Sequence, residues 1–285
     1  MEKITASIVA YQDNPMQLGR AIDSFLKSSV SGPLMIIDNS PSDDLRYTCD
    51  CPGVTYIFNN RNLGYGRGHN QAIRQFLNRS KYHLVLNADV SFAQDVIEKL
   101  VHFMENNPRA GLTMPKVLGP DGQLQMLCKL LPTPFDLATR RFFPFKNWFK
   151  SQNERYEMKH TDYNQVMNVP FLSGCFMFLR IDALKKTGLF DERFFLYAED
   201  TDLSRRMHQQ FETLFFPDVE INHVHARGSY KDFRLTFHNI KSAVQYFNKW
   251  GWFFDDERVM INQRADAQTQ SMRPTNSTLR EVKAA

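Results

Sequence analysis

The sequence is short of cysteine, of long apolar runs and of charge of one sign. Its four cysteines are unevenly spaced and form no C-x-x-C pair, so they provide neither a disulfide framework nor a zinc site of the usual spacing. The longest apolar stretches, such as residues 169–179, fall well below the roughly 18 residues of a membrane-spanning helix. We therefore expect neither a disulfide-rich miniprotein nor a membrane-spanning one.

The N-terminus also lacks the basic, apolar and small-residue zones of a signal peptide. We expect a cytoplasmic protein, associated peripherally with the inner face of the cytoplasmic membrane. Lysine and arginine exceed aspartate and glutamate by 35 − 31 = 4. This mild excess suits anionic ligands or an anionic membrane surface and gives no reason to expect a nucleic acid partner.

Strand and helix patterns alternate along the first part of the chain. Four runs have the length of buried strands and three segments have helical spacing: residues 4–10, 34–37, 54–58 and 82–86 for the strands, and 16–26, 68–77 and 93–104 for the helices. This alternation predicts an α/β fold with a mostly parallel central sheet flanked by helices. In such sheets, ligands bind at the carboxyl ends of the strands.

Polar residues follow the first two strands. Ala10 and Tyr11 end the first strand, and Asp38 ends the second. A carboxylate there can accept hydrogen bonds from a nucleobase, and an aromatic ring can stack on the base. Turn chemistry at residues 38–41 explains the pattern equally well.

Residues 62–70, Asn-Leu-Gly-Tyr-Gly-Arg-Gly-His-Asn, place three alternate glycines before a predicted helix. Glycines allow close approach to a phosphate, the helix N-terminus adds positive potential, and Arg67 adds a charge. The segment predicts a phosphate or sugar loop, with a ligand-free glycine turn as the alternative. A dinucleotide fingerprint is excluded, because Gln12-Asp13-Asn14-Pro15 follows the first strand.

Two acidic patterns complete the set. Asn87 and Asp89 end an apolar strand, and strand alternation points both side chains the same way, toward one cation or sugar hydroxyl. Helix capping is the alternative.

Further on, Glu199, Asp200 and Asp202 follow an aromatic segment and open a helix. Helix capping accounts for one or two of these acids. A carboxylate at the edge of an apolar pocket also suits a general base, which is the functional interpretation.

These segments, in this order, resemble the family 2 glycosyltransferases of the GT-A fold, rhamnosyltransferase-like branch, over about residues 4–258. The resemblance implies that Asp38 contacts the base of a nucleotide-sugar. It implies that Asp200 is the catalytic base with Glu199 beside it, and that Asp89 and His223, with His225 as the rival, hold Mg²⁺ or Mn²⁺. Asn87 replaces the first acid of the family's D-x-D pattern, which weakens the expected metal binding. The other implied contacts are Ala10, Tyr11, Asn62, Gly64, Arg67, Asn70 and Asn87 for the donor, and Gly174, Cys175 and Asp202 for the acceptor.

The implied reaction is an inverting transfer from a nucleotide-sugar, with dTDP-rhamnose favoured, to a polyprenyl-diphosphate-linked glycan in O-antigen or capsule synthesis. A sugar-phosphate nucleotidyltransferase is one alternative, although its glycine-rich basic loop after the first strand is missing here. A non-catalytic protein that binds a sugar-nucleotide or polysaccharide is the other.

We expect a GT-A domain over residues 1–230, with a nucleotide-binding half (1–115) and an acceptor half (116–230). A C-terminal amphipathic helix and aromatic segment (231–262) and a disordered polar tail (263–285) would follow. Residues 140–150 mix basic and aromatic side chains without an acid. We assign membrane contact to this segment and interpret the apolar face of the terminal helix as a cover for the sheet.

Overall fold

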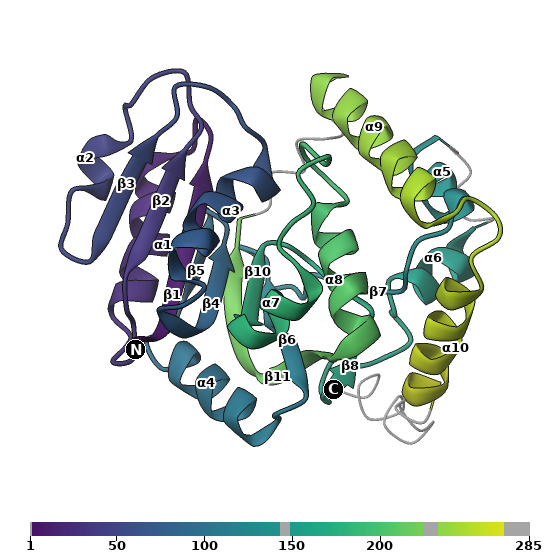
Figure 1. Ribbon diagram of the computed structural model, residues 1–285. Coiled ribbons are helices and arrows are strands. Elements are labelled where there is room, and N and C mark those ends of the chain that lie inside the picture. Colours follow the sequence, from purple (N-terminus) through teal and green to yellow (C-terminus); the bar gives the residue numbers. More distant parts are fainter. Residues whose placement is uncertain (1, 143–148, 225–232, 271–285) are drawn as a thin grey trace.

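The computed structural model describes residues 2–142, 149–224 and 233–270. Its centre is a nine-stranded sheet in the order β3-β2-β1-β4-β10-β6-β11-β5, with β8 paired to β11 (Figure 1). The strands are β1 Glu2–Ala10, β2 Leu34–Asp38, β3 Val54–Phe58, β4 Ser80–Leu86, β5 Val90–Phe92, β6 Ala110–Leu118, β8 Met167–Asn168, β10 Phe176–Arg180 and β11 Glu212–His223. β7 Cys128–Lys129 and β9 Phe171–Leu172 form a separate pair.

The α/β class is confirmed, but the sheet is parallel only in part. β3, β2, β1 and β4 are parallel, as predicted. β10 then runs antiparallel to both of its neighbours, and β11 is parallel to β6 but antiparallel to β5 and β8. β10 is antiparallel to its neighbours because the chain returns to the sheet after a long segment that holds α5, α6 and the short strands β7, β8 and β9, without the single-helix crossover that joins parallel strands.

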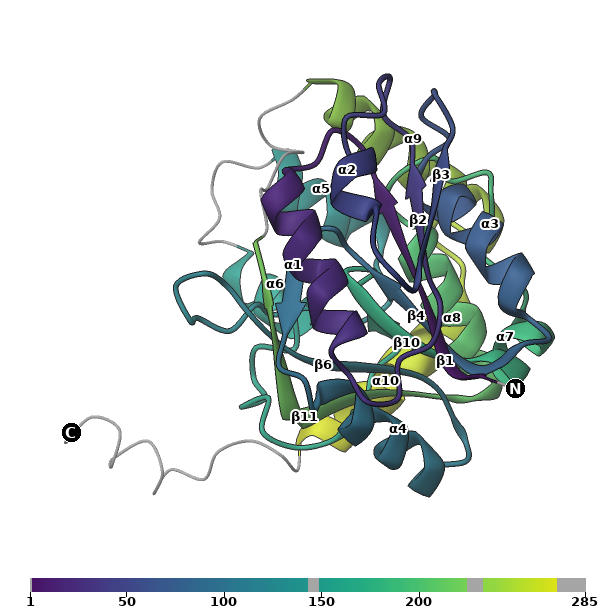
Figure 2. The same ribbon diagram turned by 90° about the vertical axis from the view of Figure 1, so that its left-hand side faces the viewer.

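Helices cover both faces of the sheet. They are α1 Pro15–Leu26, α2 Arg46–Cys49, α3 Tyr65–Phe76, α4 Val96–Asn106, α5 Pro134–Phe142, α6 Lys150–Tyr156, α7 Ile181–Thr187, α8 Glu199–Gln210, α9 Phe233–Trp250 and α10 Asp256–Gln270. Figure 2 shows α1 and α3 on opposite faces of the parallel half. α1 begins where predicted, because the Asn14 side chain accepts the N–H groups of Met16 and Gln17 and Pro15 occupies the first turn.

The two faces of β1 differ in chemistry. Ile4, Ala6, Ile8 and Ala10 are fully buried in the main apolar core with residues of α1. On the α3 side, Ser7 Oγ lies 2.7 Å from His69 Nδ1 and 2.8 Å from His83 Nε2. Burial lowers the pKa of His69, and lowers that of His83 to about 3, so both imidazoles are neutral at physiological pH.

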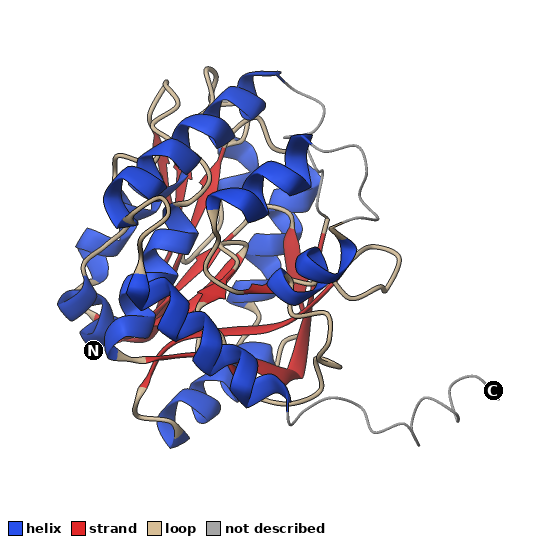
Figure 3. Cartoon of the chain, turned by 90° about the vertical axis from the view of Figure 1, so that its right-hand side faces the viewer, coloured by secondary structure: helices blue, strands red, loops and turns tan. Residues whose placement is uncertain are grey.

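The polar C-terminal segment folds further than we expected. α10 continues as one helix to Gln270 (Figure 3). Ile261, Ala265 and Thr269 are buried along one of its faces. The expectation of a disordered tail is therefore wrong for residues 263–270, because a stripe of mainly small side chains suffices to pack this helix. Residues 271–285 lie outside the described part. Within the described residues, no helix is both long and apolar enough to span a bilayer.

The apolar stripe of α9 does not cover the sheet. The apolar residues of α9 that recur at helical spacing are Phe233, Phe237, Ile240, Val244 and Phe247. The first four are exposed, and Phe247 is buried. α9 instead packs through Ser242, Tyr246 and Phe247, against Phe194 and its surroundings. Our interpretation of this helix as a cover is therefore wrong. Of the segment to which we assigned membrane contact, residues 143–148 lie outside the described part.

Candidate active site

The candidate site lies at the carboxyl ends of β1, β2 and β4, on the upper side of the molecule in Figure 1. The last residues of these strands meet there because the strands are parallel and adjacent. The end of β11 and the loop before α8 complete this edge. Charges at Asp89 and Asp200 both act on Cys175 between them, and burial with these charges raises the pKa of that thiol to about 12.

Asp38 is fully buried and already bound on both oxygens. Oδ1 accepts the Ser40 N–H at 2.8 Å, and Oδ2 accepts the Tyr56 hydroxyl. Ala10 is buried too, and its carbonyl accepts the Asn39 N–H. A base that contacts Asp38 must therefore share the carboxylate with Tyr56. Tyr11 is 48% exposed and free to stack.

Asp13 lies at the same edge and was not among the predicted site residues. Its Oδ2 accepts the Tyr11 N–H at 2.8 Å. Burial, with the charges of Asp89 and Asp38, raises the Asp13 pKa to about 6. Three acids thus share one edge, which concentrates negative potential where a cation would bind. Its position directly after the first strand was the available signal in the sequence.

The glycine-rich segment packs against protein. Gly64 has φ of +86°, and a Cβ there would lie 2.2 Å from the Phe195 carbonyl oxygen. A Cβ at Gly66 would meet Phe190, and one at Gly68 would meet Val9. The expectation that Gly64 contacts the donor is wrong, because it is buried by the loop that precedes α8. Asn62 is exposed and holds the turn by accepting the Gly64 N–H.

Two other predicted donor contacts have structural partners. Asn70 is fully buried, donates to the Phe190 carbonyl and to Glu192, and accepts the Phe190 N–H. It is therefore wrong as a donor contact. Arg67 is half exposed and lies 3.5 Å from Glu192, so an incoming phosphate would compete with that carboxylate.

Tyr65 connects three parts of the site. Its hydroxyl lies 2.9 Å from Asn87 Oδ1 and 2.7 Å from the Gly174 carbonyl oxygen. Burial, reinforced by the nearby Cys175, Glu199, Asp200 and Asp89, raises the Tyr65 pKa well above its ordinary value. Tyr65 therefore stays protonated and orients Asn87, a role that the sequence did not indicate.

Asp89 and His223 converge. His223 Nε2 lies 3.4 Å from Asp89 Oδ1, while His223 Nδ1 lies 3.0 Å from Gln125 Oε1. An outer partner of this kind leaves the other nitrogen facing the site. Two ligands of one divalent cation lie about 3 Å apart, so the pair fits a metal. Among the residues that the structure describes, no group of three His, Cys, Asp or Glu side chains gathers to hold a metal ion. His225 lies outside the described residues.

The acidic pair opens α8 from strained backbone. Tyr197 and Ala198 both have left-handed φ, of 68° and 66°. Glu199 is 4% exposed, and its Oε2 accepts no hydrogen bond from the described residues. Burial and the neighbouring Asp200 raise the Glu199 pKa to about 8, so its neutral form predominates at pH 7. Asp200 is half-buried, and its Oδ2 accepts the Gly174 N–H at 2.9 Å.

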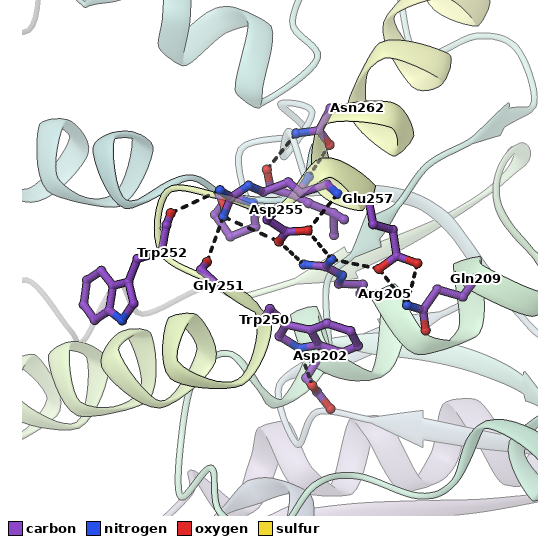
Figure 4. Close-up of polar contacts among 12 residues, drawn as sticks. Asp202, Arg205, Gln209, Trp250, Gly251, Trp252, Asp255, Glu257 and Asn262 are labelled. Carbon is purple, nitrogen blue, oxygen red and sulfur yellow. Dashed lines mark hydrogen bonds and ion pairs between the residues drawn. The ribbon is translucent and has the colours of Figure 1, made fainter.

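The predicted acceptor contacts are all buried. Gly174 supports Asp200, and the Cys175 carbonyl accepts the Asn87 N–H. Asp202 is fully buried and pairs with Arg206, Lys249 and Trp250. The expectation that Asp202 binds the acceptor is wrong, because it is fully buried two residues beyond Asp200 on α8, inside a network that fastens α8 to the C-terminal segment (Figure 4).

The same network contains a buried arginine. Arg205 is 1% exposed, and its two terminal nitrogens each lie 2.7 Å from an Asp255 oxygen. One of them also contacts Glu257, and the guanidinium lies over the Trp250 ring. Residues far apart in the sequence thereby hold the helix that carries Asp200 (Figure 4).

The sequence matches a known protein family. The sequence model described as "Glycosyltransferase like family 2" matches residues 2–241. The chain belongs to this family. The resemblance deduced from the motifs is thereby confirmed, and this glycosyltransferase has two curated relatives that act in glycan synthesis.

The first relative is the N-acetylglucosaminyl-diphospho-decaprenol L-rhamnosyltransferase of Mycobacterium tuberculosis. It is 28% identical over 196 residues, which cover 64% of this chain and 62% of that protein. The second is the low-salt glycan biosynthesis hexosyltransferase Agl10 of Haloferax volcanii, 26% identical over 65% of this chain and 57% of its own length. The match thus spans about three-fifths of each relative.

Among solved structures, GalNAc-T7 with UDP, GalNAc and Mn²⁺ superposes with a TM-score of 0.58 at 16% identity, over 78% of this chain and 43% of that one. This likeness supports the GT-A fold.

Proposed function

We propose that this glycosyltransferase transfers a sugar, with inversion, from a nucleotide-sugar to a hydroxyl of a lipid-linked glycan. One observation carries the proposal: Asp200 is a half-buried carboxylate, held by the Gly174 N–H, beside the strand ends that bear Asp89. The family assignment favours glycosyl transfer over the nucleotidyltransferase and the non-catalytic binding protein.

Asp200 acts as the general base. Its carboxylate takes the proton from the acceptor hydroxyl while that oxygen bonds to the anomeric carbon and the bond to the nucleotide diphosphate breaks. The Gly174 N–H fixes the orientation of the carboxylate. Glu199 stays largely protonated at pH 7 and adds little competing charge.

Asp89 and His223 are the residues that would hold Mg²⁺ or Mn²⁺. When bound, such a cation neutralises charge on the departing diphosphate. Asn87, oriented by Tyr65, lies beside them, and Tyr11 is placed to stack on the base. Arg67 can reach a phosphate by exchanging its ion pair with Glu192.

For the substrates, we favour dTDP-rhamnose as donor and a polyprenyl-diphosphate-linked sugar as acceptor, in bacterial O-antigen, capsule or other cell-surface polysaccharide synthesis. The name of the first curated relative supports this choice. Such an acceptor places the enzyme at the cytoplasmic face of the membrane.

The decisive experiment is Asp200→Asn, assayed with dTDP-rhamnose and a polyprenyl-diphosphate-linked acceptor. We expect turnover to fall by about 10²–10⁴-fold. The matched control is Asp182→Asn, which alters an exposed acid in the first turn of α7 and should leave turnover unchanged.

A thermal-shift panel of dTDP, UDP, GDP and their sugars, with and without Mg²⁺ or Mn²⁺, separates binding from chemistry. Asp200→Asn should keep the nucleotide-dependent shift, whereas Asp89→Asn should lose its metal-dependent part. Full activity of Asp200→Asn would contradict the mechanism.

A further inference from the structure

The outward side of α9 is unusually apolar. We call Phe233, Phe237, Ile240 and Val244 the outer face of α9, and their exposed fractions run from 83% to 39%. They recur every three or four residues, so they form one continuous stripe. The fold does not use this stripe, because α9 is held from its other side.

The stripe continues beyond the helix into residues 252–254, which we call the aromatic turn. Trp252 donates a hydrogen bond to Asn248, itself exposed one helical turn beyond Val244. Phe253 and Phe254 follow, 78% and 96% exposed. Exposed phenylalanines in such number mark a contact surface, because single exposed apolar residues are ordinary but a contiguous group is not.

The charge on the helix and the aromatic turn themselves has one sign. Residues 233–254 contain no aspartate or glutamate, and Arg234 and Lys241 are exposed beside the outer face. Three acids follow the aromatic turn directly: Asp255 is buried, Asp255 and Glu257 pair with Arg205, and Asp256 is exposed. Aromatic and aliphatic side chains that penetrate the headgroup level, flanked by cations, form the pattern of a helix lying in an anionic bilayer surface. A protein interface would not require the absence of acids.

The surface is also placed for a lipid-linked acceptor. α9 runs along the upper side of the molecule in Figure 1, the side that carries the strand ends and the start of α8. On its inner side, Ser242 donates to the Leu196 carbonyl and His238 stacks on Phe195 at 4.4 Å. A bilayer against the outer face would therefore lie one helix thickness from the loop that leads into Glu199 and Asp200.

We propose that the outer face of α9 and the aromatic turn dock this enzyme on an anionic lipid bilayer. The inference deepens the proposed function, on which it rests, by naming the surface that meets the membrane. It adds the C-terminal helix to the membrane contact that the sequence analysis assigned to residues 140–150.

Vesicle flotation of the full chain tests the proposal with lipid alone. The probes are phosphatidylcholine vesicles with and without phosphatidylglycerol, containing neither donor nor acceptor. We expect binding to the anionic vesicles that weakens with added salt. Combining Phe237→Asp, Phe253→Asp and Phe254→Asp should weaken binding at least about tenfold for each phenylalanine that leaves the bilayer. Arg234→Gln with Lys241→Gln should weaken it about fivefold for each charge.

Tyr47→Asp is the matched control, because it places the same charge at an aromatic position that is 91% exposed on α2, outside this surface. It should float like the wild type. Asp200→Asn should float as well, so failure of the catalytic proposal is distinguishable from failure of this one.

A second assay compares two acceptors. The triple phenylalanine variant should lose activity on an acceptor in vesicles, through a raised KM, and keep activity on a short-chain water-soluble acceptor. Wild-type protein that does not float, or a triple variant that floats equally well, overturns the proposal. So does light scattering that shows a wild-type dimer dissociated by the three substitutions, since the surface would then bind a second copy.

Discussion

α3 and α9 both donate a hydrogen bond to the loop that precedes α8, yet they differ in which of their side chains are buried. α3 is polar and glycine-rich, and the Tyr65 N–H donates to the Phe195 carbonyl. α9 is rich in phenylalanine, and Ser242 donates to the next carbonyl, that of Leu196. α3 nevertheless buries glycine, histidine and asparagine along with Ala72, Ile73 and Phe76, whereas α9 leaves most of its apolar stripe in solvent.

This contrast shows that residues near the site are buried where the backbone of their helix lies close to neighbouring backbone, whether they are polar or apolar. Small residues let α3 lie against β1 and the loop, and its polar side chains are then paired internally. Hydrophobicity alone would place the α9 stripe inward. Each prediction below tests one side of the contrast, from the largest expected effect to the smallest.

The two sides of α9 should respond very differently to truncation. Phe247→Ala removes a side chain that is 2% exposed and should cost about 3–5 kcal/mol of the free energy of unfolding. Phe237→Ala removes one that is 58% exposed and should change it by no more than about 0.5 kcal/mol. Urea denaturation of both variants measures the difference. Equal losses would mean that the outer face contributes to folding.

For α3, the expected sensitivity is to added volume. Gly64→Ala forces a Cβ toward the Phe195 carbonyl at a positive φ and should cost about 3 kcal/mol. Gly122→Ala also has positive φ, but nothing lies within 4 Å of the added carbon, so its cost should be only about 1 kcal/mol. Unfolding midpoints of the two variants isolate the contact. If they match, close packing at Gly64 is not the determinant.

The buried histidines on the α3 side of the sheet should make the free energy of unfolding depend on pH. Their folded pKa values are lowered, so the unfolded state binds more protons below about pH 6.5. Each histidine should then reduce the free energy of unfolding by up to about 1.4 kcal/mol per pH unit as the pH falls from 6.5. His83→Gln should make the slope shallower in urea titrations at pH 7 and 5. An unchanged slope would place the acid sensitivity elsewhere.

Glu199, which follows the loop that α3 and α9 both contact, should give the free energy of unfolding the opposite dependence on pH. The folded pKa of Glu199 is about 8 and exceeds its unfolded value. Its protonated carboxyl therefore contributes fully to the stability of the folded state below about pH 4.3, and this contribution is lost as the pH rises to 8. Glu199→Gln should therefore raise the melting temperature at pH 8 and change it little at pH 4. A lower melting temperature at pH 8 would indicate a stabilising charge on Glu199.

Much of the fold could be predicted because its signals are local. Strand lengths and helical spacing located the parallel half and α1. Residue type and order led to the proposals for Asp89, Asp200 and His223. The antiparallel strands could not be predicted, because pairing between strands far apart in the sequence leaves no periodic trace.

The errors in the site share one cause. Gly64, Asn70 and Asp202 have residue types that suit ligand contact, but distant residues bury them: Phe195, Phe190 and Trp250 respectively. Asp13 and Tyr65 were missed for the converse reason, since only the folded chain brings them to Asp89 and Asn87.

The buried Arg205 has a consequence for exchanging catalytic domains between enzymes. The family match ends at residue 241, inside α9, whereas the counter-charges of Arg205 lie at Asp255 and Glu257. A chain cut at the family boundary would leave a guanidinium in the interior without a counter-ion, at a cost of about 3–5 kcal/mol. The smallest segment of this enzyme that can be transferred intact to another protein is thus longer than the segment that matches the family. A chimaera joined at residue 241 would need a replacement for both acids.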